Sequence, residues 1–184
     1  MYGGKRGGLR GWLVDRLGGG GESIYTFFAC VLAMAVSGFG AYLTKQPLLF
    51  PSLGPTAFLF FESPMSAQSS PRNTLIGHAV AVLAGAASLA VFGLLHHPSV
   101  LVEGVSPARV GAGALSLALT GSVLLLLKSS HPPTGATTLI VSLGLLKTPR
   151  QMAVLMAGVV LLTVVCWIVN RAAGVPVPPW SSRE

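Results

Sequence analysis

The chain has 184 residues, of which 52% are hydrophobic and 9% are charged, and its mean hydropathy is +0.71. Soluble domains carry about 25% charged residues, so this composition excludes an ordinary soluble domain and predicts an integral all-α membrane protein. The formal net charge of +7 does not indicate nucleic-acid binding. The basic residues gather at the ends of apolar stretches, where membrane topology explains them.

Two terminal segments are predicted to be tails. Residues 1–23 are rich in glycine and basic residues and contain no cleavable signal peptide, so we expect a flexible cytoplasmic tail that contacts anionic lipids. Residues 172–184 are predicted to form a second cytoplasmic tail. Between them lie four long apolar windows, at residues 24–43, 76–95, 110–127 and 152–169. Each has about 18 to 20 residues, enough for one helix to cross a hydrocarbon core of ~30 Å.

Two shorter apolar windows, 48–61 and 132–146, begin around the same motif, P-x-x-G-x-T, at residues 51–56 and 132–137. Proline disfavours helical geometry in the residue before it, and glycine keeps the backbone permissive. We therefore expect an extended stretch, 45–51 in the first copy, that returns to the middle of the membrane and there starts a short helix. The alternative is a re-entrant hairpin that enters and leaves on one face.

The order of segments predicts two repeats, 24–97 and 110–171, joined by a loop at 98–109. In each repeat the short window is followed by Pro-Arg and a polar residue, Pro71-Arg72-Asn73 or Pro149-Arg150-Gln151, and then by a long window. Three crossings per repeat would turn the second repeat upside down relative to the first.

If all six windows cross the membrane, eight Lys and Arg residues lie on the cytoplasmic side and four on the outer side. If the two short windows are re-entrant, seven lie on the cytoplasmic side and five on the outer side. The positive-inside bias favours six crossings, and both arrangements keep the termini in the cytoplasm.

Inverted repeats would bring the starts of the two short helices face to face in the membrane. A helix N-terminus carries unpaired N–H groups and a partial positive charge, so two opposed N-termini predict an anion site. Hydroxyl groups could line it, and the glycines would let a ligand approach the backbone. Helix capping is the alternative explanation for the hydroxyls. The candidate substrate-binding residues are Ser52, Gly54, Thr56, His131, Thr134, Gly135 and Thr137.

Four further residues are candidate accessory groups: His78, Arg72, Asn73 and Arg150. His131 could donate a hydrogen bond to an anion or couple transport to pH, or it could simply orient the Pro-Pro turn. His96 and His97 are adjacent and point about 100° apart on a helix, with no third ligand at a suitable spacing, so we expect no metal site. We also expect no cofactor.

The motifs resemble those of the HPP family of small integral membrane proteins. The resemblance rests on residues 130–137, which include His131-Pro132-Pro133, on residues 52–57 and 68–73, on Gly77-His78, and on Asn170-Arg171. It extends over residues 24–171. It implies a protein with four spanning helices, in a family of which some members move nitrite across plastid or cyanobacterial membranes. The chain differs from the usual family pattern at Pro55-Thr56.

The residues and the resemblance together predict a channel or secondary transporter for a small monovalent anion, nitrite by resemblance, and not an enzyme. The protein would act in a lipid bilayer, in the bacterial cytoplasmic membrane. Small residues repeat every fourth position at Ala29, Ala33, Ser37 and Ala41 and at Gly77, Ala81 and Gly85, and such faces allow close helix packing within or between subunits. Six segments are few to shield a polar path from lipid, so we expect a homo-oligomer. The alternatives are a membrane enzyme that uses Ser130 with His131, and a scaffold or sensor subunit.

Overall fold

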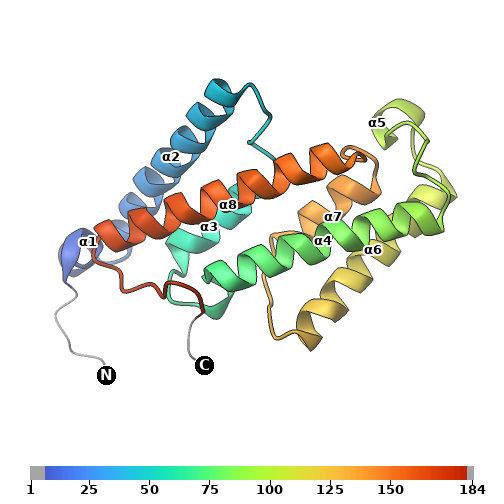
Figure 1. Ribbon diagram of the computed structural model, residues 1–184. Coiled ribbons are helices and arrows are strands. Elements are labelled where there is room, and N and C mark those ends of the chain that lie inside the picture. The colour runs from blue at the N-terminus through green and yellow to red at the C-terminus, as the bar shows by residue number, and fades with distance from the viewer. Residues whose placement is uncertain (1–6, 182–184) are drawn as a thin grey trace.

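The computed structural model describes residues 7–181, and every regular element in this range is a helix (Figure 1). Four helices are long and apolar enough to cross a membrane, and two shorter helices, α3 and α7, lie between them in the chain. The all-α class and the four spanning helices are thus confirmed. The long helices are α2 (Gly19–Thr44), α4 (Pro71–Val91), α6 (Pro107–Leu126) and α8 (Pro149–Ala172); the short ones are α3 (Leu53–Glu62) and α7 (Thr134–Ser142).

Three of the long helices begin with the same local chemistry. Ser70, Ser106 and Thr148 are N-caps, and each is followed by a proline at the first helical position. Each cap oxygen accepts a hydrogen bond from the third backbone N–H of its helix, at 3.2 to 3.3 Å. Because proline has no N–H and its φ angle suits a helix, this pairing starts a helix at a defined residue.

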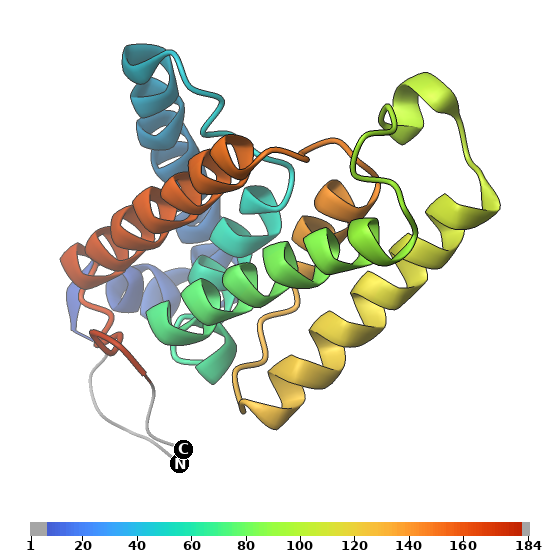
Figure 2. The same ribbon diagram turned by 45° about the vertical axis from the view of Figure 1, so that its right-hand side comes forward.

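The long helices form a central pair with one helix on either side. α4 and α8 pack against each other, α2 lies on the α8 side and α6 on the α4 side (Figures 1 and 2). The short helices fill the two remaining spaces: α3 packs on α2 and α8, and α7 packs on α6 and α4. The packing of these six helices is therefore symmetric. If α2 is replaced by α6, α3 by α7 and α4 by α8, and the reverse, every pair of helices that pack together corresponds to another pair that also pack together.

The bundle has two ends, which we name after their arginines. At the Arg72 end, the Arg72 guanidinium donates to the carbonyls of Leu127 and Lys128 at 3.4 and 3.3 Å, so the start of α4 meets the end of α6. At the Arg150 end, the start of α8 and the loop after α2 line one recess, which includes Gln46.

Both short segments run from one end to the other. The first leaves the Arg150 end at Gln46 and finishes α3 beside η1 (Ala67–Ser69), which leads into α4 at the Arg72 end. The second leaves the Arg72 end at Lys128, and beyond α7 the carbonyl of Leu143 accepts from Val100 N in the loop after α4. Of the extended entry expected at residues 45–51, residues 47–50 belong to no helix or turn, whereas Lys45 has a left-handed backbone with φ 54°. This geometry differs from that of a hairpin whose two ends share one face.

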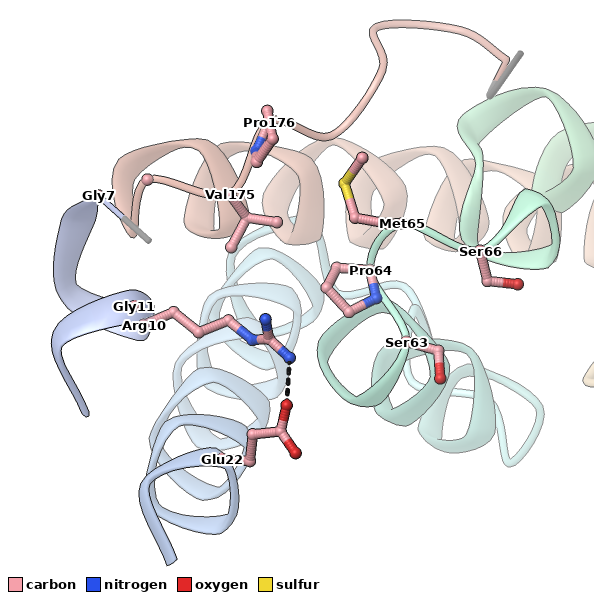
Figure 3. Close-up of a pocket in the computed structure, with 11 residues that line it drawn as sticks. Gly7, Arg10, Gly11, Glu22, Ser63, Pro64, Met65, Ser66, Val175 and Pro176 are labelled. Atoms are coloured by element: carbon pink, nitrogen blue, oxygen red, sulfur yellow. Dashed lines mark hydrogen bonds and ion pairs between the residues drawn. The ribbon is translucent and has the colours of Figure 1, made fainter. Parts of the chain in front are cut away.

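The N-terminal segment differs from the flexible tail that we expected. Residues 8–17 form a helix, α1 (Gly8–Leu17), and α2 already begins at Gly19. Arg10 holds α1 in place: its guanidinium forms an ion pair with Glu22 at 2.9 Å, and its backbone N–H donates to Ala173 O at 3.2 Å. Arg10 and Glu22 line a recess together with residues after α3 and after α8 (Figure 3). Residues 1–6 and 182–184 of the expected tails lie outside the described part.

The loop expected at 98–109 contains the short helix α5 (Val100–Glu103), and α6 begins inside it at Pro107.

The small-residue faces pack within the chain. Ala29, Ala33 and Ser37 are buried. On α4, a Cβ built at Gly77 would lie 2.7 Å from Thr134 Cγ2, and one at Gly85 would lie 2.7 Å from Val141 Cβ. The two glycines of α4 therefore allow α7 to approach closely.

Candidate functional site

The equivalent threonines of the two P-x-x-G-x-T motifs meet on either side of His78. Thr137 Oγ1, in the first turn of α7, lies 2.7 Å from His78 Nδ1. Thr56 Oγ1, in the first turn of α3, lies 3.2 Å from His78 Nε2. All three side chains are completely buried. Two motifs that are far apart in the sequence thus meet through one imidazole of α4.

His131 joins this cluster from the segment that precedes α7. Its Nε2 lies 3.3 Å from Thr56 Oγ1, and its Nδ1 lies 2.7 Å from the carbonyl oxygen of Gln68 in η1. The His78 and His131 rings are 5.3 Å apart and nearly perpendicular. A carbonyl oxygen can only accept, so Nδ1 of His131 donates to Gln68. We name Thr56, His78, His131 and Thr137 the His–Thr cluster.

Ser52 is the N-cap residue of α3, but its hydroxyl caps nothing. The side chain is fully buried, and its Oγ has no hydrogen-bond partner among the described residues. Its carbonyl oxygen lies 3.0 Å from Thr56 Oγ1, which places Ser52 one turn from the His–Thr cluster. Burying a hydroxyl without a hydrogen-bond partner costs about 1–3 kcal/mol of stability. The Ser52 hydroxyl therefore lacks a hydrogen bond that it would be expected to make.

The start of α7 offers fewer free N–H groups than an isolated helix would. The N–H groups of Thr134, Gly135 and Ala136 donate to the carbonyls of His131, Pro132 and Pro133 at 3.0 to 3.2 Å. The Thr134 hydroxyl also donates to His131 O, at 2.7 Å. In this conformation the groups that can face a ligand are therefore the side chains of the cluster more than the backbone of α7.

The two motif glycines do not lie against the cluster. Gly54 is exposed, and a Cβ built there would meet nothing within 4 Å. A Cβ at Gly135 would meet Leu117 Cδ1 at 3.5 Å, an ordinary contact. The structure thus brings together Thr56, His131 and Thr137 with the accessory His78, and places Ser52 and Thr134 next to them.

The remaining accessory candidates line two recesses at opposite ends of the bundle. Arg72 and Asn73 line one of about 340 Å³ together with Lys128. Arg150 lines one of about 350 Å³, together with Gln151 and the loop after α2. The first recess lies close to the cluster, because Ala67 in its lining precedes Gln68 and because Asn73 Nδ2 donates to Ser130 O at 3.4 Å.

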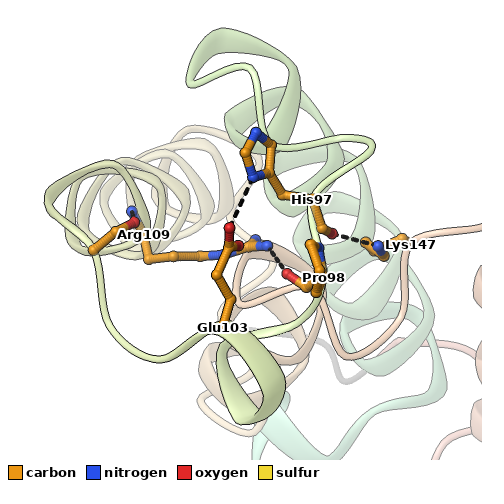
Figure 4. A network of polar contacts seen from close by, with 6 residues as sticks. His97, Pro98, Glu103, Arg109 and Lys147 are labelled. Atoms are coloured by element: carbon orange, nitrogen blue, oxygen red, sulfur yellow. Dashed lines mark hydrogen bonds and ion pairs between the residues drawn. The ribbon is translucent and has the colours of Figure 1, made fainter.

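Two side chains are buried and hydrogen-bonded in a way that the sequence did not predict. Asn170 is completely buried; it donates to Phe60 O at 3.0 Å and accepts from Tyr25 Oη at 2.8 Å. Arg109 is 1% exposed, and its guanidinium donates to the carbonyl of Pro98 (Figure 4) and also to that of Ser142. An arginine in the first turn of a helix that begins with Ser-Pro suggests a solvated end, so the sequence pattern gave no sign of this burial.

Comparison with known proteins identifies the family once this arrangement is described. The sequence matches the family described as "HPP, transmembrane region" over residues 19–178. The chain belongs to this HPP transmembrane family. A Dictyostelium discoideum protein described only as a transmembrane protein is 31% identical over 121 residues, which cover 65% of this chain and 36% of that protein. No solved structure matches the chain.

Proposed function

We propose that this HPP protein is a channel or secondary transporter for a small monovalent anion, which binds between the starts of α3 and α7. The observation that carries the proposal is the meeting of the two motifs in the His–Thr cluster, beside the unpartnered hydroxyl of Ser52. Nitrite is the substrate class that the family resemblance indicates. The description of the Dictyostelium discoideum relative names no substrate, so nitrite rests on the family resemblance alone.

The symmetry of helix packing between the two halves of the chain supports an inverted repeat. Each half contributes a long helix, a short helix and a second long helix, and the two short segments run in opposite directions between the ends. Lys45 and Lys128, the two non-glycine residues with positive φ in the described range, end the first long helix of each half. Inverted repeats whose broken helices meet at the midplane are a recurring design of transport sites.

The chemistry of the cluster favours an anion over a cation. Its hydrogen bonds come from hydroxyl and imidazole groups, and no carboxylate takes part in them within residues 7–181. Cation sites in membranes use carboxylates or rings of carbonyls, whereas hydroxyl and N–H donors solvate anions. The start of α3 adds a partial positive charge.

The two arginine recesses would act as vestibules. Each places a guanidinium at the mouth of the bundle, Arg72 at one end and Arg150 at the other. A positive charge at a mouth raises the local concentration of anions, so both ends could admit the same substrate. In our topology the Arg72 end faces the cytoplasm and both chain termini lie on that side.

The arrangement argues against the enzyme alternative. A nucleophile needs a base within hydrogen-bond reach, but both ring nitrogens of His131 already contact Gln68 and Thr56, and Ser130 is not among their partners.

The exposed side of α2 carries large apolar residues, including Phe27, Phe28 and Phe39. In the membrane, this face would contact lipid or a second copy of the chain, and we propose a homo-oligomer.

The test is nitrite uptake by purified protein in liposomes, compared with protein-free liposomes. We expect uptake by the native protein and a loss of about tenfold for Ser52→Ala, because the anion would lose a hydroxyl donor inside the membrane. Ser88→Ala is the matched control, since Ser88 is also a fully buried, unpartnered serine of the described chain and lies three turns from His78 on α4. Thermal stability should not fall in either variant.

Equal uptake by native protein and Ser52→Ala would remove Ser52 from the site. If the native protein moves no more nitrite than empty liposomes, and moves none of nitrate, formate or chloride, the transport proposal is wrong.

A further inference from the structure

We infer that the His–Thr cluster is a proton relay, so that each anion crosses the membrane together with one proton. The inference rests on the proposed anion transport and adds the coupling ion. It is drawn from the order of the four side chains and from the number of protons that they can hold.

The four side chains form one line with a single branch at Thr56, whose hydroxyl also lies 3.0 Å from Ser52 O. It runs from Thr137 Oγ1 to His78 Nδ1 at 2.7 Å, from His78 Nε2 to Thr56 Oγ1 at 3.2 Å, from Thr56 Oγ1 to His131 Nε2 at 3.3 Å, and from His131 Nδ1 to Gln68 O at 2.7 Å. Every side chain in the line can both donate and accept a proton. All of them are at least 99% buried.

When both imidazoles are neutral and the Thr56 hydroxyl donates to His131 instead of Ser52 O, one carbonyl determines the direction of every hydrogen bond in the line. Gln68 O can only accept, so His131 carries its proton on Nδ1 and accepts at Nε2 from the Thr56 hydroxyl. Thr56 has then used its only proton and accepts from His78 Nε2–H. His78 Nδ1 in turn accepts from the Thr137 hydroxyl. Each group is satisfied, and all four bonds point the same way.

The same atoms accept one additional proton without losing a partner. If His131 is doubly protonated, its Nε2–H donates to Thr56 Oγ1. The Thr56 hydroxyl can then turn to the carbonyl oxygen of Ser52, which lies 3.0 Å away. The cluster therefore has two complete hydrogen-bond patterns that differ by one proton, which is what a relay requires.

The relay lies beside the recess at the Arg72 end of the bundle. Gln68 lies between Ala67 and Ser70, which line the Arg72 recess. At the other end, the line of hydrogen bonds stops at Thr137 among the described residues, and Thr138 bonds separately to Ser116 O at 3.4 Å. A carbonyl accepts a hydrogen bond but does not carry a proton onward, so His131 would exchange its proton with water of the Arg72 recess when its Nδ1–H leaves Gln68 O.

The charges around the relay explain why proton and anion would move together. Arg72 on α4 and Lys128 after α6 are the charged residues of the recess beside its Gln68 end, and α3 and α7 contribute only hydroxyls to its hydrogen bonds. No acidic side chain of the described chain is bonded to it. An imidazolium buried without a carboxylate is costly in a membrane protein. A bound anion would provide the missing negative charge, so the pair would cross with no net charge.

The experiment measures nitrite uptake and internal pH together in liposomes that contain a trapped pH dye, with protein-free liposomes subtracted because nitrous acid itself crosses lipid. We expect nitrite uptake to acidify the interior, an acidic exterior to accelerate it, and a potassium–valinomycin membrane potential to leave its rate unchanged. Thr56→Val should lower coupled uptake about tenfold, because the line loses its middle hydroxyl. Thr56→Ser should restore it.

A second variant guards against misfolding of the first. In His131→Gln, the remaining uptake should respond to membrane potential and no longer acidify the interior. His96→Gln is the matched control, because His96 is exposed and lies outside the relay. Native uptake that follows membrane potential without acidification would overturn the relay and leave anion transport standing. Coupling that survives in both Thr56→Val and His131→Gln would also overturn it. No uptake by the native protein would overturn the proposed function instead.

Discussion

At the scale of single residues, buried polar side chains form hydrogen bonds that connect helices far apart in the sequence. Asn170 is the clearest case, because its one amide binds the end of α3 through Phe60 O and α2 through the Tyr25 hydroxyl. Interhelical hydrogen bonds of this kind contribute about 0.6 to 2 kcal/mol each in membranes. Their loss also leaves the partner groups without a bond in a place that water does not reach.

We expect Asn170→Leu to lower the free energy of unfolding by about 1–3 kcal/mol, because Phe60 O and the Tyr25 hydroxyl would both lose their partner. Tyr25→Phe should cost less, since the Asn170 amide keeps its bond to Phe60 O. Thermal unfolding in detergent measures both effects. Tyr42→Phe is the control, because Tyr42 is 66% exposed. Equal stability of native protein and Asn170→Leu would show that this amide does not hold α8 to α2 and α3.

At the scale of elements, the close approach of α7 to α4 depends on two glycines. Gly77 faces Thr134 and Gly85 faces Val141, and the site residues Thr137 and His78 lie between these two contacts in the sequence of the helices. Any widening of this interface would lengthen the 2.7 Å contact between them. The packing of the pair thus sets the geometry of the site.

Gly77→Ala and Gly85→Ala should each destabilise the protein by about 1–3 kcal/mol, because the added methyl group would lie too close to a side chain of α7. Both should also reduce nitrite uptake. Gly121→Ala in α6 provides the comparison, since a Cβ there would meet nothing within 4 Å. It should stabilise by up to about 1 kcal/mol through helix propensity alone. If all three variants behave alike in thermal unfolding, the two glycines are not needed for the packing of α7.

At the scale of the whole molecule, the direction of the short segments decides which residues face each side of the membrane. Lys128 lies at the Arg72 end of the bundle, Arg150 lies at the opposite end, and both side chains are exposed. If both short segments cross, these residues face opposite sides. If the segments are re-entrant hairpins, they face the same side.

A membrane-impermeant thiol reagent distinguishes these arrangements. In a Cys30→Ala, Cys166→Ala background, we expect Lys128→Cys to be labelled from one side of oriented vesicles and Arg150→Cys from the other. Uptake measured in the same vesicles would show that the variants are folded. Labelling of both positions from the same side would contradict the inverted repeat.

The sequence by itself determined the membrane class, the four spanning helices and the places where the apolar pattern breaks. These features depend on hydropathy summed over a window, or on a local motif such as Ser-Pro at a helix start, and neither needs knowledge of the partner helix. The helices at Pro71, Pro107 and Pro149 begin within a few residues of the predicted windows.

The tertiary structure alone decided which polar groups meet. His78 and Thr137 are 59 residues apart in the chain, Thr56 and His131 are 75 apart, and Tyr25 and Asn170 are 145 apart. Such pairs depend on how the helices pack and rotate, which a single sequence does not encode locally. For the same reason the sequence did not reveal the burial of Arg109, the ordered helix at residues 8–17, or the carbonyls that occupy the first N–H groups of α7.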